Sequence, residues 1–112
     1  MQIGIDVGAT KIESVVLENN GQEKYRSRTS CPKDYLSIIS AIKDISQKLE
    51  KEFKMELPIG VCHPGIHSPQ TGLVKNAPNC YWLEKKPFQN DLRKALNKEV
   101  FCENDANCFA LS

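Results

Sequence analysis

The sequence has no block of a single charge, no long hydrophobic run and no closely paired cysteines. Its 15 Lys and Arg residues are interspersed among 14 Asp and Glu, giving a net charge of +1. This pattern predicts neither a nucleic-acid partner nor an acidic tail. No apolar stretch approaches the ~18 residues that a membrane span requires. Because Asp6 interrupts the first apolar segment, we also expect no signal peptide and a cytoplasmic protein.

The five cysteines are an odd number, and none stands in a Cys-x-x-Cys pair. A disulfide framework or a four-thiolate zinc site is therefore not expected within this chain. We expect reduced, mostly buried thiols. They are Cys31, Cys62, Cys80, Cys102 and Cys108.

What remains is an ordinary globular composition, 40% hydrophobic and 26% charged, in 112 residues. That length is enough for one domain with a real core. The sequence has neither internal repeats nor low-complexity segments. Residues 101–112 are typical of a strand followed by the start of a helix that nothing caps. We therefore interpret the chain as cut rather than finished.

Alternating apolar and β-branched residues predict three strands, at Ile3–Val7, Ile12–Leu17 and Glu23–Thr29. Short connections make them antiparallel, and the third, more polar strand is expected nearer an edge. Apolar residues at three- and four-residue steps then predict a long amphipathic helix over Tyr35–Phe53, with Asp34 as its N-cap.

A short apolar strand at Leu57–Cys62 follows this helix and is expected to run parallel to the first strand. Residues 66–87 are predicted to be irregular, followed by a helix over Phe88–Lys98 and a strand over Glu99–Glu103. A further helix begins at Asp105. The order β-β-β-α-β-α-β-α predicts an α/β fold with a mixed five-stranded sheet.

The first candidate site follows the first strand and contains Asp6, Gly8, Thr10 and Lys11. Backbone N–H groups of such a turn can point at phosphate oxygens, and Asp6 can hold Mg2+ directly or through water. The alternative is a plain hairpin turn with one exposed acid. The Walker phosphate loop is absent.

The second candidate is Asn104-Asp105, at the junction of a strand and a helix, where open α/β sheets bind ligands. A carboxylate there can take a proton from a substrate hydroxyl, and an adjacent amide can bind a second hydroxyl. The alternative is that Asp105 is only a helix N-cap.

The third candidate is the loop of residues 65–79, whose amides, hydroxyls and glycines suit a polyol. The alternative is a surface hairpin, because Pro69-Gln70-Thr71-Gly72 is a plausible turn. His63 and His67 have the spacing of a metal pair on a helix, but the intervening Pro-Gly argues against a helix.

Together these segments resemble the sugar kinases of the ROK family (repressors, open reading frames, kinases). The segments that carry the resemblance are Ile3–Lys11, Val61–Gly65, Thr71–Ala77, Trp82-Leu83 and Asn104–Cys108. They cover essentially the whole chain, in order and at matching separations. The resemblance implies a ribonuclease-H-like, actin-like ATPase lobe and ATP-dependent phosphorylation of a hexose hydroxyl.

On the sugar side, the resemblance implies that Asp105 is the general base toward the sugar hydroxyl. Asn104 would bind sugar hydroxyls, Gly65 would lie against the sugar, and Asn76 is a weaker sugar-contact candidate.

For ATP and Mg2+, the resemblance implies roles for Asp6, Gly8, Thr10 and Lys11. Two positions depart from the family pattern, which usually has glycine where Ala9 and Cys62 stand.

The family's kinases continue well beyond residue 112, so the resemblance implies that residues 1–112 are the N-terminal lobe of a two-lobe kinase. The absent lobe would carry the adenosine site and, in many members, a structural zinc. The intact protein is then expected to bind a hexose and ATP and to form a homodimer, and the isolated lobe to be inactive.

Several alternatives stay open at this point. Fructose or mannose is the preferred substrate, with N-acetylglucosamine or glucose as the alternative within the family. Two alternatives belong to other functional classes. One is a sugar-sensing transcriptional repressor, and the other is a non-catalytic relative that binds a sugar or a nucleotide.

Overall fold

A mixed five-stranded sheet forms the centre of the computed structural model, which describes residues 1–77 and 80–104. Its strands in spatial order are β3 (Glu23–Ser30), β2 (Lys11–Leu17), β1 (Gln2–Val7), β4 (Ile59–His63) and β7 (Val100–Asn104). β1, β2 and β3 are antiparallel, whereas β4 is parallel to both β1 and β7. The carboxyl ends of β1, β4 and β7 therefore meet at the same edge of the sheet.

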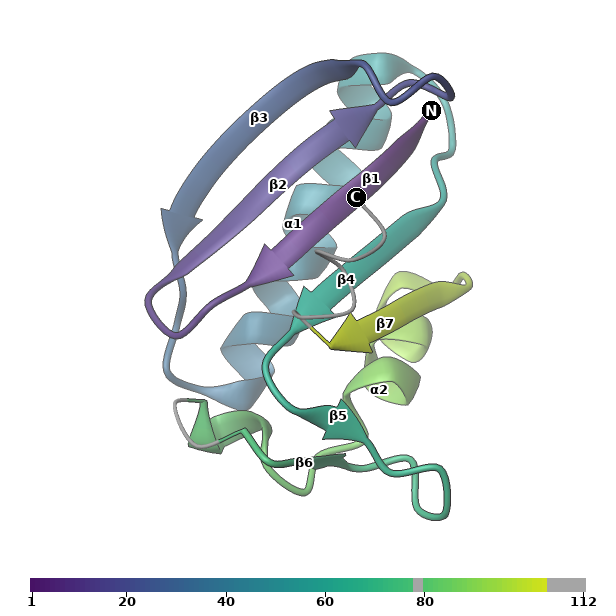
Figure 1. The fold of residues 1–112 in the computed structure, drawn as a ribbon. Helices are drawn as coiled ribbons and strands as arrows, with labels where there is room; N and C mark the ends of the chain where they lie inside the picture. Colours follow the sequence, from purple (N-terminus) through teal and green to yellow (C-terminus); the bar gives the residue numbers. More distant parts are fainter. Residues whose placement is uncertain (78–79, 105–112) are drawn as a thin grey trace.

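Two helices, α1 (Tyr35–Phe53) and α2 (Phe88–Leu96), pack behind the sheet in the view of Figure 1. α1 begins where the Asp34 carboxylate accepts a hydrogen bond from the Ser37 N–H at 3.0 Å, which confirms the predicted N-cap. Ile38, Ile39, Ile42 and Leu49 of the predicted apolar stripe are buried, and Ser46 is buried as well.

Strand alternation decides what faces the helices. In β1, Ile3, Ile5 and Val7 are buried, whereas Gln2 and Asp6 are exposed on the opposite face. Because successive side chains of a strand point to opposite faces, β1 contributes to the core and also presents an acid at its carboxyl end.

Polar contacts tie the helical layer together. The Tyr35 hydroxyl donates to the Asp91 carboxylate at 2.6 Å and so joins α1 to α2. Lys98 Nζ lies 2.8 Å from Glu50 Oε2 and 2.6 Å from the Leu57 carbonyl oxygen. Burial acts to raise the pKa of Glu50, but hydrogen bonds from Lys98 and from the Leu57 N–H outweigh it and hold the pKa below its usual range.

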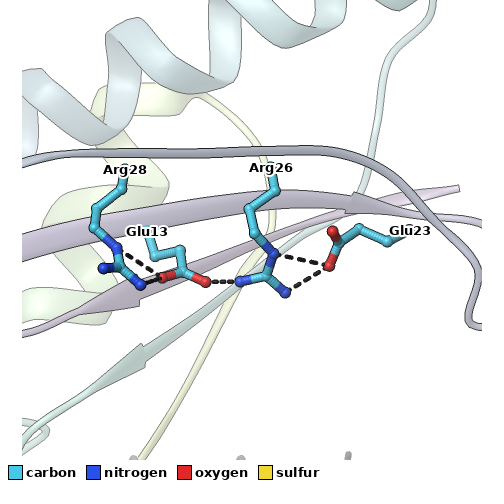
Figure 2. Close-up of polar contacts among 4 residues, drawn as sticks. All are labelled: Glu13, Glu23, Arg26 and Arg28. Atoms are coloured by element: carbon cyan, nitrogen blue, oxygen red, sulfur yellow. Dashed lines mark hydrogen bonds and ion pairs between the residues drawn. The ribbon is translucent and has the colours of Figure 1, made fainter.

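A charged ladder covers the β2–β3 edge of the sheet (Figure 2). Arg28 donates to Glu13 Oε2 from Nε at 3.1 Å and from Nη2 at 2.8 Å. Arg26 contacts both Glu13 and Glu23. Such exposed pairs contribute at most about 1 kcal/mol each. Charges on an edge strand do, however, discourage pairing with another chain.

The segment between β4 and α2 is more ordered than the prediction of irregular structure for residues 66–87. It contains the short β5 (Ile66–His67) and β6 (Val74–Lys75), which pair antiparallel, and a 3-10 turn, η1 (Tyr81–Leu83). Two-residue strands have no readable alternation, so the sequence pattern does not predict them.

Two predicted boundaries shift for backbone reasons. β4 begins at Ile59 rather than Leu57, because Pro58 has no N–H to donate to the ladder. α2 ends at Leu96 rather than Lys98, because Asn97 adopts a left-handed conformation with φ 55°. The predicted helix starting at Asp105 lies outside the described residues.

The expectation of reduced thiols is wrong for Cys62, which is disulfide-bonded. Cys31 and Cys102 carry free thiols, and burial raises the pKa of both. Over residues 1–77 and 80–104, neither helix combines the length and the hydropathy needed to cross a membrane.

Candidate active site

The carboxyl ends of β1, β4 and β7 bring the two predicted halves of the site to one edge of the sheet. Asp6 pairs with Cys62, and Cys62 pairs with Glu103, so these side chains lie on the same face. His63 and Asn104 pair one position further along. Neighbouring strands lie about 4.8 Å apart, so the backbones at Asp6 and Glu103, two strands apart, are separated by about 10 Å. Two residues nearly a hundred positions apart in sequence thus lie only two strands apart in the sheet.

The turn after β1 is closed by its own backbone. The Gly8 N–H donates to the Lys11 carbonyl at 2.8 Å, and a Cβ at Gly8 would lie 3.2 Å from the same oxygen. Gly8 is not in the left-handed region, so it provides space rather than an unusual φ. Its amide is already used within the hairpin, and a phosphate contact from that N–H would have to replace this bond.

Asp6, Thr10 and Lys11 are exposed around this turn. The Thr10 carbonyl accepts from the Cys31 N–H at 2.8 Å, which anchors the turn to the segment after β3. A carboxylate and a hydroxyl are oxygen ligands of the kind that Mg2+ prefers, and a lysine supplies positive charge for phosphate. The residues present therefore fit a metal-bound phosphate.

Gly65 occupies a position that tolerates no side chain. Its φ is +77°, and a Cβ there would lie 2.5 Å from the Lys75 carbonyl oxygen and 3.0 Å from Ala77 Cβ. Asn104 Nδ2 donates to the Gly65 carbonyl at 2.5 Å. Two residues predicted to contact the same ligand are thus in direct contact with each other, although 39 positions separate them in sequence.

Asn76 stands beside this contact, exposed and in a left-handed conformation with φ 61°. Asparagine adopts this conformation more readily than most residues. Asp105, the predicted general base, follows Asn104 in the chain and lies outside the described residues.

A cavity of about 370 Å3 opens beside Asn104. This volume falls within the range of small-molecule sites. Its lining combines the ends of β4 and β7 with β5 and the start of α2. The lining residues are His63, Ile66, His67, Gln89, Cys102, Glu103 and Asn104.

Two histidines form one wall of this cavity. His63 and His67 meet edge to face with ring centroids 4.7 Å apart. His67 Nε2 accepts from the Gln89 N–H at 3.3 Å, and His63 Nδ1 lies 2.8 Å from the Pro64 carbonyl oxygen. The His63 Nδ1 therefore carries the proton, which leaves its buried Nε2 as an acceptor with no donor in the described part of the chain.

Both imidazoles are neutral at neutral pH. Burial lowers the pKa of His63. For His67, burial first and the neighbouring His63 second lower the pKa to about 4, while Glu103 acts in the opposite direction. Residues 1–77 and 80–104 contain no group of three or more His, Cys, Asp and Glu side chains arranged to hold a metal ion.

No sequence pattern indicated Gln89 as part of this site. Its N–H donates to His67, and its Oε1 accepts from the Cys102 N–H at 2.8 Å. It therefore links β5, α2 and β7, which only tertiary structure brings together.

Known proteins resemble the chain in both sequence and fold. The family model described as the ROK family matches residues 2–112. An N-acetyl-D-glucosamine kinase from Histophilus somni (strain 129Pt) is 36% identical over 113 residues, which are 100% of this chain and 37% of that protein. The chain thus spans little more than a third of the length of such relatives.

Two crystal structures share the fold. A ROK hexokinase from Thermus thermophilus superimposes with a TM-score of 0.84 at 28% identity, over 98% of this chain and 37% of that one. A ROK family glucokinase from Streptomyces griseus, in complex with glucose and AMPPNP, gives 0.83 at 25% identity, over 97% and 34%.

Proposed function

The chain belongs to the ROK family, and on that basis we propose that it is the N-terminal lobe of an ATP-dependent sugar kinase. The actin-like ATPase fold that the family resemblance implies would consist of two lobes with a cleft between them. Residues 1–112 would supply one wall of that cleft. The reaction would transfer a phosphoryl group from ATP to a sugar hydroxyl.

One observation carries this proposal. The Asn104 side chain is held against the Gly65 carbonyl, at the same sheet edge as the exposed Asp6. A polar amide and a close-packed glycine suit a polyol, and an acid with a nearby hydroxyl and lysine suits a metal-bound phosphate. Phosphoryl transfer depends mainly on placing these two partners in line and neutralising charge.

Each residue would then have a defined task. Asp6 would hold Mg2+ directly or through water, and Thr10 and Lys11 would contact ATP phosphates. Gly8 would leave room for the turn. Asn104, Gly65 and Asn76 would orient the sugar, and Asp105 would accept the hydroxyl proton. When bound, the metal ion neutralises phosphate charge.

N-acetylglucosamine is the substrate that we propose first. The relative from Histophilus somni, matched over the whole chain, is an N-acetyl-D-glucosamine kinase. This reverses the preference for fructose or mannose that the sequence alone suggested. Glucose is the second candidate, because a structural neighbour was crystallised with glucose and AMPPNP.

The test uses the intact protein with ATP, Mg2+ and a panel of N-acetylglucosamine, glucose, mannose and fructose. We expect phosphorylation with the highest kcat/KM for N-acetylglucosamine. The 112-residue chain alone should show little or no turnover. An intact protein that phosphorylates no sugar in the panel would refute the proposal.

The general base is tested in the same assay by Asp105→Asn. A general base contributes about 10²- to 10⁴-fold to rate, so kcat should fall by that factor. The unfolding temperature should stay close to that of the wild type. Activity near the wild-type level would assign the proton transfer to another group.

A further inference from the structure

Glu84 holds the backbone of the loop that contacts Gly65. Its Oε1 accepts from the Asn76 N–H at 3.1 Å, and its Oε2 accepts from the Ala77 N–H at 2.9 Å. A carboxylate that accepts from two consecutive amides fixes the orientation of the peptide plane between them. Hydrogen bonds to a charged acceptor are stronger than neutral ones.

The position of Glu84 is itself well anchored. It follows η1, in which Trp82 and Leu83 are buried. The next residues pair with β6, because the Lys85 N–H donates to the Val74 carbonyl at 2.7 Å and the Val74 N–H donates to the Lys86 carbonyl at 2.9 Å. The carboxylate is therefore held on a short rigid element.

A chain of contacts leads from this carboxylate to the sugar side of the site. Glu84 binds the amides of residues 76 and 77, and Ala77 Cβ and the Lys75 carbonyl enclose the space where a Gly65 side chain would stand. The Gly65 carbonyl in turn accepts from Asn104. A shift of residues 75–77 would release or distort the Gly65–Asn104 contact.

We propose that Glu84 is a positioning residue for sugar recognition: it sets the backbone of residues 76–77 and thereby the placement of Gly65 and Asn104. This role rests on the proposed function. Glu84 does not itself touch the sugar in this proposal. It acts through the loop, and its effect should be selective for the sugar over ATP, whose proposed contacts lie around Asp6.

The charge and shape of the carboxylate are both required. Two N–H donors face its two oxygens, and both oxygens of an ionised carboxylate accept. In Glu84→Gln the side chain keeps its size, but one oxygen becomes an NH₂ donor facing a backbone N–H. One of the two bonds is lost, and an amide of the loop is left without its acceptor.

The experiment compares intact wild-type protein with Glu84→Gln and with a matched control, Glu52→Gln, on the exposed side of α1. KM and kcat are measured separately for sugar and for ATP. Hydrogen exchange of the amides of residues 76 and 77 is followed on the same proteins. We expect the sugar KM of Glu84→Gln to rise about tenfold, in line with loss of a charged hydrogen bond. The ATP KM should stay within about twofold, and the two amides should exchange faster.

The kinetic results distinguish a positioning role of Glu84 from a general loss of enzyme function. A raised sugar KM with an unchanged ATP KM and faster exchange at residues 76 and 77 supports the positioning role. Equal sugar KM values in Glu84→Gln and Glu52→Gln, in an active wild type, overturn it and leave the proposed function intact. A parallel loss for both substrates overturns it as well. A wild-type protein that phosphorylates no sugar removes the proposed function and this role together.

Discussion

Replacing Gly65 by alanine tests the close packing at the centre of the candidate site. Two costs add at this position. Gly65 has a φ of +77°, and the new Cβ would lie 2.5 Å from the Lys75 carbonyl oxygen. Gly72 provides the matched control, because its φ is +73° and nothing lies within 4 Å of its Cβ position. Gly72→Ala therefore carries the backbone strain without the collision.

The two variants should differ by a predictable amount. Placing alanine in the left-handed region costs about 1–2 kcal/mol. Forcing a methyl group into a filled space costs about 1–3 kcal/mol more. We expect Gly72→Ala to lower the free energy of unfolding by the first amount alone and Gly65→Ala by the sum, about 2–5 kcal/mol.

The measurement is urea unfolding of the intact protein, followed by the sugar KM. Gly65→Ala should raise that KM at least about tenfold, because relieving the collision moves residues 75–77 away from the Asn104 contact, and a lost hydrogen bond to a fixed partner is worth about this much. Gly72→Ala should leave it unchanged. Equal unfolding free energies for the two variants would refute the collision, and with it the packing described around Gly65.

Two further outcomes follow from the buried polar contacts. Lys98→Ala in the intact protein should lower the free energy of unfolding by about 1–3 kcal/mol, since it removes a partner from Glu50 and from the Leu57 carbonyl. The control Lys94→Ala, at an exposed position of α2, should have little effect. Equal losses for the two variants in urea unfolding would argue against the Lys98 network. The folded pKa of His67 lies near 4, below that of an unfolded histidine, so the unfolded state binds its proton first as the pH falls. The contribution of His67 to the free energy of unfolding should therefore be complete above about pH 6.5 and decline toward pH 4, by about 1–2 kcal/mol after allowance for the half-exposed ring. His67→Gln should flatten this decline. A pH profile of stability that His67→Gln leaves unchanged would contradict the lowered pKa of His67.

The sequence predicted the parts of the fold that are governed by local pattern. Alternation and helical periodicity located β1, β2, β3 and α1, and the crossover helix implied that β4 runs parallel to β1, which is confirmed. Neither rule applies to β5 and β6, whose two-residue lengths are set by pairing with each other and with residues 85–86. Propensity cannot detect such main-chain contacts.

Some residues of the candidate site were likewise predicted from the sequence, and others were found only in the structure. Asn104 was found from its residue type and position and Gly65 from the family resemblance, and the structure brings them into contact. Gln89 was missed because its partners, His67 and Cys102, lie 22 and 13 positions away in sequence. Glu84 was missed because its contacts with the amides of residues 76 and 77 depend on the folded path of the loop. The roles given to Asp6, Thr10, Lys11 and Asp105 stay predictions.

The double pairing of β1 has a consequence for the order in which this lobe forms. β1 meets β2 through a connection of only a few residues, whereas its pairing with β4 must close more than 40 intervening residues, including all of α1. Closing a longer loop costs more entropy, and non-local pairings slow folding. The hairpin that carries Asp6 is therefore expected to form early, while the Gly65–Asn104 contact waits for the parallel half of the sheet. A newly made chain would therefore complete the turn after β1 before the end of β7 reaches the end of β4.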